Sequence, residues 1–314
     1  MMLTVLEIGL QASIQDAGRK GYRRVGVPAS GFMDPFAGRV ANLLVGNPEG
    51  SALIETMMGS ISVQSDVDCL VAACGVGYEL TVRGESFPLW MTVLARAGER
   101  ISLDNRGGAW GYLAVSGGLA AGLALGSRST FTGGGTSAFG GKILAAGNCL
   151  PTGSPAGEWR MRAGECLEMN LDEFYDPGRP VGVIPGPHRD DFSLESLDRF
   201  VASPYVILPV SNRMGYRLQG EALVRKEPRE VLSMGMLPGC IQVPASGQPI
   251  VLLADAPASG GYPMAGCVCQ VDLPALVQRL PGESEVCFTW QPVEDSQRAF
   301  TRLWRQVRME LSMD

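Results

Sequence analysis

The amino-acid sequence predicts a mainly β protein, with short strands arranged as barrels or sandwiches in two similar halves and a few peripheral helices. A chain of 314 residues is longer than a single hydrophobic core usually serves, so roughly two domains are expected. Its 41 glycines and 21 prolines are spread among short apolar runs, as turns between strands require. Few windows, by contrast, have the periodicity of a helix.

Five short apolar runs are expected to be buried strands. They are rich in Val, Leu and Ile, and Gly, Pro or Asp bounds them. The runs are "LVAACGV" (70–76), "LWMTVLA" (89–95), "GYLAVSGG" (111–118), "YVILPVS" (205–211) and "PIVLLADA" (249–256).

Four segments are expected to be helices. Asp34, Ser193 and Asp272 precede the first three, where a side-chain oxygen can accept a hydrogen bond from a free helix N–H. The last segment spaces its apolar residues on one helical face between arginines, so it is expected to lie against its own barrel or to dock a partner. The segments are 34–46, 193–203, 272–280 and 294–312.

Two short repeats favour similar halves. "VPASG" occurs at 27–31 and 243–247, and "SGG" occurs at 116–118 and 259–261. The segment 151–180 has turn composition throughout, which places a boundary there. The expected organisation is therefore an N-terminal β-barrel domain, a C-terminal β-barrel domain and a helical tail, at 1–178, 179–293 and 294–314.

Charge and hydropathy exclude several classes of partner. A net charge of −6 and a pI near 5.1 disfavour nucleic acid, whose binding domains cluster Lys and Arg. No run reaches the roughly 18 uninterrupted apolar residues of a membrane span. The N-terminus also lacks the basic region of a signal peptide, so a cytoplasmic location is expected.

The cysteines are expected to be mostly buried free thiols, because most stand inside apolar runs. The closest pair, Cys267 and Cys269, has strand spacing, and His188 is the only histidine. No metal site is therefore expected. The eight cysteines are Cys69, Cys74, Cys149, Cys166, Cys240, Cys267, Cys269 and Cys287.

Three familiar motifs are absent. The Gly-rich stretch 133–142 is not a phosphate loop, because Thr136 stands where a glycine is needed and Ile143 replaces the magnesium-binding hydroxyl. A flexible turn is the simpler interpretation, although its N–H groups could cradle an anion. The chain also has no nucleophile elbow and no biotinylation sequence. Biotin, if used, must be carried by another chain, and any ATP is used by a complex in which this chain supplies no phosphate loop.

The stretch "PVSNRMGYRLQG" (209–220) is the first candidate site. Several polar residues lie close in sequence to one glycine. Arg213 could bind a carboxylate or phosphate through two parallel hydrogen bonds. Asn212 could orient an amide or carbonyl. A solvated turn between strands remains the alternative. The other candidate residues of this stretch are Ser211 and Tyr216.

The stretch 239–263 is the second candidate site. A buried strand delivers Asp255 to a loop that ends in Gly260, Gly261 and Tyr262. A carboxylate at a strand end beside a double glycine suits a substrate loop, and it also suits an ordinary β-turn. Gly260, Gly261 and Tyr262, together with Gln242 on the preceding strand, are substrate-binding candidates. The catalytic candidates are Asp34, Arg213 and Asp255.

Asp34, in "VPASGFMDPF" (27–36), has two interpretations. As an N-cap it would contribute about 0.5–2 kcal/mol, and Asn or Ser would serve as well. The surrounding turn residues also fit a loop that brings a carboxylate to a fixed place. We expect Asp34 both to cap the helix and to face a cleft.

Several long motifs fall in the order of a known family. They are "SIQDAGRKGYRRVGVPASGFMDPFAGRVANLLVGNPEGSALIE", "GYLAVSGG", "LGSRSTF", "IPGPHRDDF", "SNRMGYRLQG" and "GCIQVPASGQPIVLLADAPASGGYP". Over nearly its full length the chain resembles the allophanate hydrolase subunit 2 or KipA-like family, also called biotin-dependent carboxyltransferase-like. This family includes the C subunit of bacterial 5-oxoprolinase and a region of urea carboxylase.

The resemblance implies two cyclophilin-like β-barrel halves and separately encoded partners. It implies a 5-oxoprolinase complex that opens the 5-oxoproline lactam to glutamate in an ATP-dependent reaction. The partners would be a KipI-like protein, which is the B subunit, and a LamB/YcsF-like protein, which is the A subunit. Two alternatives stay open: a carboxyltransferase acting on urea or a similar amide with a separate biotin carrier, and a non-catalytic KipA-like regulator that binds a KipI-like protein.

The chain also departs from the family pattern. Relatives usually carry two threonines before Gly-Gly-Tyr-Pro, where this chain has Ala258 and Ser259, and a lysine is common where Met264 stands. One hydroxyl and one positive charge are therefore missing. The resemblance implies an altered substrate preference or lost catalysis if those groups bind phosphate or bicarbonate in relatives.

Overall fold

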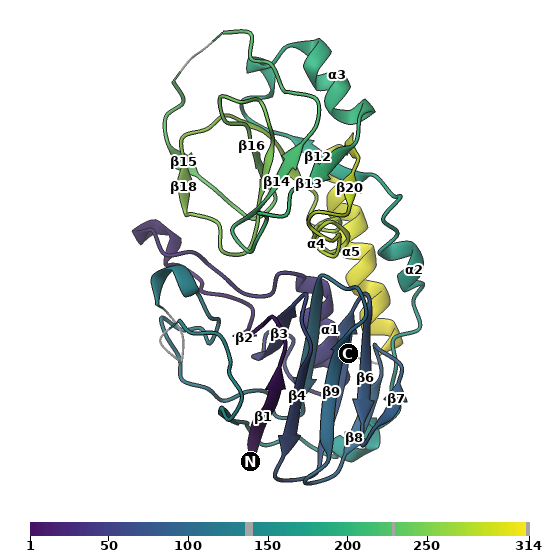
Figure 1. Ribbon diagram of the computed structural model, residues 1–314. Coiled ribbons are helices and arrows are strands. Elements are labelled where there is room, and N and C mark those ends of the chain that lie inside the picture. Colours follow the sequence, from purple (N-terminus) through teal and green to yellow (C-terminus); the bar gives the residue numbers. More distant parts are fainter. Residues whose placement is uncertain (136–140, 228–229, 312–314) are drawn as a thin grey trace. The chain divides into compact units, whose positions relative to one another are not determined.

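The computed structural model describes residues 1–135, 141–227 and 230–311 (Figure 1). Its contacts group the chain into two compact units. The first unit comprises Met1–Lys20, Ser30–Met169 and Gln306–Asp314, and the second comprises Gly21–Ala29 and Asn170–Arg305. The domain limits inferred from the sequence stay predictions. The Gly-rich turn expected at 133–142 falls partly outside the described residues.

The first unit is built from two antiparallel sheets. One has the strand order β11-β1-β4-β9-β6-β7 and the other has the order β2-β3-β10-β5-β8. The strands are β1 (Met2–Ile8), β2 (Gln11–Gln15), β3 (Leu53–Met57), β4 (Ile61–Ser65), β5 (Cys69–Gly75), β6 (Tyr78–Val82), β7 (Glu85–Phe87), β8 (Thr92–Ala95), β9 (Arg100–Asn105), β10 (Trp110–Val115) and β11 (Cys149–Pro151).

Side chains of both sheets form one apolar core, which includes Leu3, Val63, Val71 and Leu113. Helix α1 (Pro35–Leu44) packs against β5 and β10 of the five-stranded sheet. Strand β10 is therefore buried at every residue. This double burial explains why its sequence is a continuous apolar run rather than an alternating one.

The second unit contains an eight-stranded sheet with the order β20-β13-β14-β17-β16-β19-β12-β21, and β15 pairs separately with β18. All neighbours are antiparallel except β12 and β21. The strands are β12 (Val181–Pro185), β13 (Tyr205–Ile207), β14 (Gly215–Gln219), β15 (Met234–Gly235), β16 (Cys240–Gln242), β17 (Ile250–Leu252), β18 (Ser259–Gly260), β19 (Met264–Val268), β20 (Glu285–Val286) and β21 (Phe288–Trp290).

The remaining helices are short except for the last. They are α2 (Leu171–Phe174), α3 (Leu194–Ala202), α4 (Leu273–Val277) and α5 (Val293–Glu310), with 3-10 turns at Arg23–Val25, Thr132–Gly134, Trp159–Arg162 and Arg189–Asp191. The prediction of a mainly β protein with few helices is confirmed. Among the described residues, no helix combines the length and apolar character that a bilayer crossing needs.

Two of the three predicted N-caps form. Asp34 accepts hydrogen bonds from Phe36 and Ala37, and Ser193 accepts one from Ser196. Asp272 makes no capping bond. Its carboxylate instead accepts the N–H of Gly182 at 3.0 Å and pairs with Arg179 at 2.8 Å, because tertiary partners compete successfully with the local helix end.

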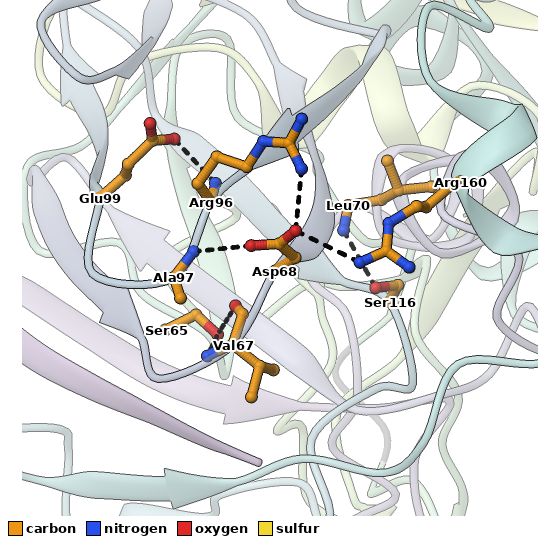
Figure 2. A network of polar contacts seen from close by, with 9 residues as sticks. All are labelled: Ser65, Val67, Asp68, Leu70, Arg96, Ala97, Glu99, Ser116 and Arg160. Atoms are coloured by element: carbon orange, nitrogen blue, oxygen red, sulfur yellow. Dashed lines mark hydrogen bonds and ion pairs between the residues drawn. The ribbon is translucent and has the colours of Figure 1, made fainter.

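A polar network fastens the start of β5 to neighbouring loops in the first unit (Figure 2). Asp68 accepts the N–H of Ala97 at 3.0 Å and pairs with Arg96 and Arg160 at 2.9 and 3.2 Å. The Ala97 hydrogen bond, followed by the two arginines, lowers the pKa of the Asp68 carboxyl below its usual value. The network therefore favours the ionised carboxylate and joins three separate segments of the chain.

Candidate functional site

Arg213 and Asp255, both candidates from the sequence, form a buried ion pair in the second unit. The Arg213 Nε lies 2.9 Å from Oδ2 of Asp255, and Nη2 lies 3.2 Å from Oδ1. The two residues are only 8% and 4% exposed. The Asp255 N–H also donates to the Arg213 carbonyl at 2.9 Å. Both oxygens of the carboxylate are thus engaged by one guanidinium, the planar geometry in which such pairs are strongest.

The neighbouring polar residues mostly shape the turn before β14. The Ser211 hydroxyl accepts the N–H of Arg217 at 3.0 Å, and the Asn212 side chain accepts the N–H of Met214 at 2.8 Å. Tyr216 is fully buried, and its hydroxyl donates to the Val277 carbonyl at 2.7 Å. Of these three candidates, Asn212 alone is exposed, so only its side chain can meet a ligand without a change in the second unit.

Gln242 and Gly260 approach each other closely. Gln242 ends β16 and is 5% exposed, and its Nε2 lies 3.5 Å from the sulfur of Met236. A Cβ placed on Gly260 would come within 2.3 Å of the same Nε2. Glycine at this position therefore keeps space for the Gln242 amide, whose two N–H groups can donate to a carbonyl oxygen.

Gly261 and Tyr262 line a cavity of about 280 Å³ in the second unit. Tyr262 is 51% exposed, so its ring and hydroxyl are accessible from solvent. The charged residues Arg225 and Glu230 also line this cavity. Its mixed lining suits a small polar molecule. The other lining residues are Val231, Val243, Pro244, Ala245 and Pro263.

Asp34 lies in the first unit and is completely buried, so its side chain does not face an open cleft, contrary to the expectation from the sequence. Its Oδ1 accepts the N–H groups of Phe36 and Ala37 at 3.0 and 2.9 Å, so the capping role predicted from the sequence is present. The loop before it is constrained, because Ser30 has φ 56° and Gly31 has φ 96°. A non-glycine residue in this left-handed region is uncommon and marks a backbone that its surroundings hold in place.

A buried network around Glu55 and Tyr112 holds the Asp34 loop. The N–H of Asp34 donates to the Tyr112 hydroxyl at 2.6 Å, and the N–H of Met33 donates to Glu55 Oε2 at 2.7 Å. Tyr112 faces Glu55 on β3 and Cys74 on β5. Burial, and then the nearby carboxylates, raise the pKa of Tyr112 well above its usual value. Tyr112 therefore stays a neutral hydroxyl across the physiological pH range.

The comparison with protein families covers most of both units. Residues 25–290 match the family described as "Carboxyltransferase domain, subdomain A and B". The chain belongs to this carboxyltransferase domain family. The expected relationship to the biotin-dependent carboxyltransferase-like proteins is thereby confirmed.

Relatives of this carboxyltransferase domain fall into two groups. The 5-oxoprolinase C subunit of Escherichia coli is 36% identical over 313 residues, which cover 97% of this chain and 98% of that protein. Urea amidolyase of Saccharomyces cerevisiae is 31% identical over 308 residues, which cover 90% of this chain but 16% of that protein. The crystal structure of the K. lactis urea amidolyase superposes with a TM-score of 0.88 at 25% identity, covering 98% of this chain and 20% of that one.

Sequence reasoning missed two residues of the carboxyltransferase domain that hold Asp34. Glu55 and Tyr112 stand in β3 and β10 and are 1% and 0% exposed. The available signal was the single acidic residue inside the apolar run "SALIETMM" (51–58), because a carboxylate in a buried strand is rare unless it has partners. Which partners it has depends on strand register, which the sequence does not reveal.

Proposed function

We propose that this chain is the C subunit of an ATP-dependent 5-oxoprolinase, which opens the lactam of 5-oxoproline to give glutamate. The observation that carries the proposal is the 36% identity to the E. coli 5-oxoprolinase C subunit over 98% of that protein. Similarity along the full length supports an equivalent part in an equivalent assembly. The chain corresponds to a much smaller share of urea amidolyase, 16%.

The protein acts only with partners in this proposal. A KipI-like B subunit and a LamB/YcsF-like A subunit complete the complex in the cytoplasm. The complex uses ATP, and this chain contributes no phosphate loop to it.

The proposed substrate site uses the second candidate stretch. The Gln242 amide donates to the lactam carbonyl, and the loop 260–262 together with Asn212 contacts the rest of the small molecule. Arg213 and Asp255 act as a pair, supported by their bidentate contact at 2.9 and 3.2 Å. Ser211 and Tyr216 fix the turn and the strand that carry Arg213. Asp34 is proposed as a separate catalytic carboxylate.

Carboxyl transfer is the second candidate function. The match to the carboxyltransferase domain over residues 25–290 favours it, as does the superposition on a urea amidolyase. In that case a separate protein carries biotin, and the same polar groups bind an amide such as urea. Asn212, Arg213 and Asp255 suit either reaction, because both substrates present an amide.

The test is ATP-dependent glutamate release from 5-oxoproline by this chain co-expressed with its B-like and A-like partners, each omitted in turn. We expect activity with all three and loss of it when this chain is left out. Activity that persists without this chain would refute the proposal. An assembled but inactive complex would also refute it, and would direct attention to carboxyl transfer or to regulation of the KipI-like partner.

A further inference from the structure

Cys240 and Cys267 face each other on neighbouring strands of the second unit. Strands β16 and β19 are antiparallel, and their register places Cys240 opposite Cys267. The next opposing residues, Gly239 and Val268, are hydrogen-bonded to each other, because the Val268 N–H donates to the Gly239 carbonyl at 2.8 Å. The two cysteines therefore occupy a non-hydrogen-bonded position, where opposing Cα atoms are about 4.5 Å apart. Disulfides span Cα separations of about 4.4–6.8 Å.

The surroundings of the two thiols differ. Cys240 is buried, whereas Cys267 is partly exposed. The N–H of Leu237 donates to the Cys240 sulfur at 3.4 Å. Arg23 is anchored close by, because its guanidinium donates to the carbonyls of Met236 and Pro257.

These contacts favour a thiolate on Cys240. A hydrogen bond from the Cys267 thiol lowers the pKa of Cys240, the Leu237 N–H and the charge of Arg23 add to this effect, and burial opposes it. The same hydrogen bond and burial raise the pKa of Cys267. The lowered pKa of Cys240 makes it the better nucleophile of the two facing cysteines.

We propose that Cys240 and Cys267 are a redox-active pair, which hydrogen peroxide oxidises to a cross-strand disulfide and a thiol reductant returns to two thiols. The Cys240 thiolate attacks one peroxide oxygen, the O–O bond breaks, and the departing hydroxide takes the Cys267 proton to give water. The Cys267 thiolate then attacks the sulfur of the Cys240 sulfenic acid and releases hydroxide, which is protonated to a second water. Two thiols and one peroxide thus give one disulfide and two waters.

The disulfide would lie at the base of the candidate site. Strand β16 ends at Gln242, and β19 begins at Met264, shortly after Gly260 of β18 and the following residues Gly261 and Tyr262. Oxidation would therefore fix the spacing of the two strands that carry these residues and remove the negative charge beside Arg23. The proposal does not depend on the proposed function.

Peptide mapping of the full chain after hydrogen peroxide treatment tests the proposal. A protease that cleaves before aspartate separates 198–254, which contains Cys240, from 255–271, which contains Cys267 and Cys269. We expect the intact mass to fall by two hydrogen atoms, and these two peptides to stay linked until a thiol reductant is added. Cys240→Ser and Cys267→Ser should each abolish the link, whereas the control Cys269→Ser should retain it.

The wild-type result is decisive even if a variant fails to fold. Unlinked peptides that carry sulfinic or sulfonic acid would overturn the proposal, because they would show that Cys267 does not resolve the oxidised Cys240. A link that survives Cys267→Ser and disappears in Cys269→Ser would also overturn it. It would assign the disulfide to Cys269.

Discussion

The Asp34 carboxylate caps helix α1, and substitutions can separate this capping role from the proposed catalytic role. Asp34→Ala removes the acceptor for the N–H groups of Phe36 and Ala37, so we expect a loss of about 0.5–2 kcal/mol in the free energy of unfolding. Asp34→Asn keeps a capping oxygen and should recover most of that stability. Urea denaturation of the three proteins measures both effects.

The same variants separate the two roles of Asp34 in the assembled complex. If the carboxylate takes part in the reaction, Asp34→Asn should lose glutamate release while it stays folded. Full activity of Asp34→Asn would limit Asp34 to capping.

Gly260 offers a test of the Gln242 amide. A methyl group on Gly260 would come within 2.3 Å of the Gln242 Nε2, whereas one on Gly235 would meet nothing within 4 Å. Gly260→Ala should therefore displace the end of this side chain and raise the KM for 5-oxoproline, and Gly235→Ala, on the strand paired with β18, is the matched control. Equal KM values for the two variants would remove Gln242 from the substrate site.

At the scale of elements, the Arg213–Asp255 pair joins the turn before β14 to the segment that follows β17. Arg213→Ala or Asp255→Ala leaves one buried charge without its partner and should lower the free energy of unfolding by about 3–5 kcal/mol. The double variant should cost less than the sum of the two single changes. Chemical denaturation in a double-mutant cycle measures this coupling, and strict additivity would show that the pair contributes no interaction energy.

The Asp68 network predicts an acid-sensitive contribution to stability. The lowered pKa of Asp68 means that the folded state favours its carboxylate. Its stabilising effect is therefore complete above the unfolded value near 3.8 and is lost as the pH falls through the lower folded value. Asp68→Asn should lower the Tm at neutral pH, and the difference from wild type should shrink below pH 3.8. A Tm difference that is constant down to the acid limit would contradict the assignment.

At the scale of the whole molecule, the prediction concerns which substrate the assembly recognises. The chain covers 98% of the E. coli 5-oxoprolinase C subunit and 16% of the yeast urea amidolyase, so the complete complex should release ADP faster with 5-oxoproline than with urea and bicarbonate. The rate of ADP release, measured with each substrate in turn, decides between the two functions. Stimulation by urea and bicarbonate alone would favour carboxyl transfer, and this chain by itself should show neither activity.

The sequence by itself determined the fold class, four of the helices and some of the strands. Each of the five apolar runs overlaps a strand, as 70–76 does with β5 (Cys69–Gly75), and the expected helices correspond to α1, α3, α4 and α5. These features were predictable because they depend on local properties, namely turn residues, apolar periodicity and capping side chains. The family could also be recognised from motifs that are contiguous in the chain.

Only the tertiary structure decided which side chains meet. Arg213 pairs with Asp255, 42 residues away in the chain, and Tyr112 bonds the N–H of Asp34 over a separation of 78 residues. Asp272 fits the local pattern of an N-cap, yet bonds Gly182 and Arg179 instead. Contacts of this kind follow from sheet register and close packing, where a shift of one residue turns every side chain to the opposite face. Local sequence patterns do not encode that register.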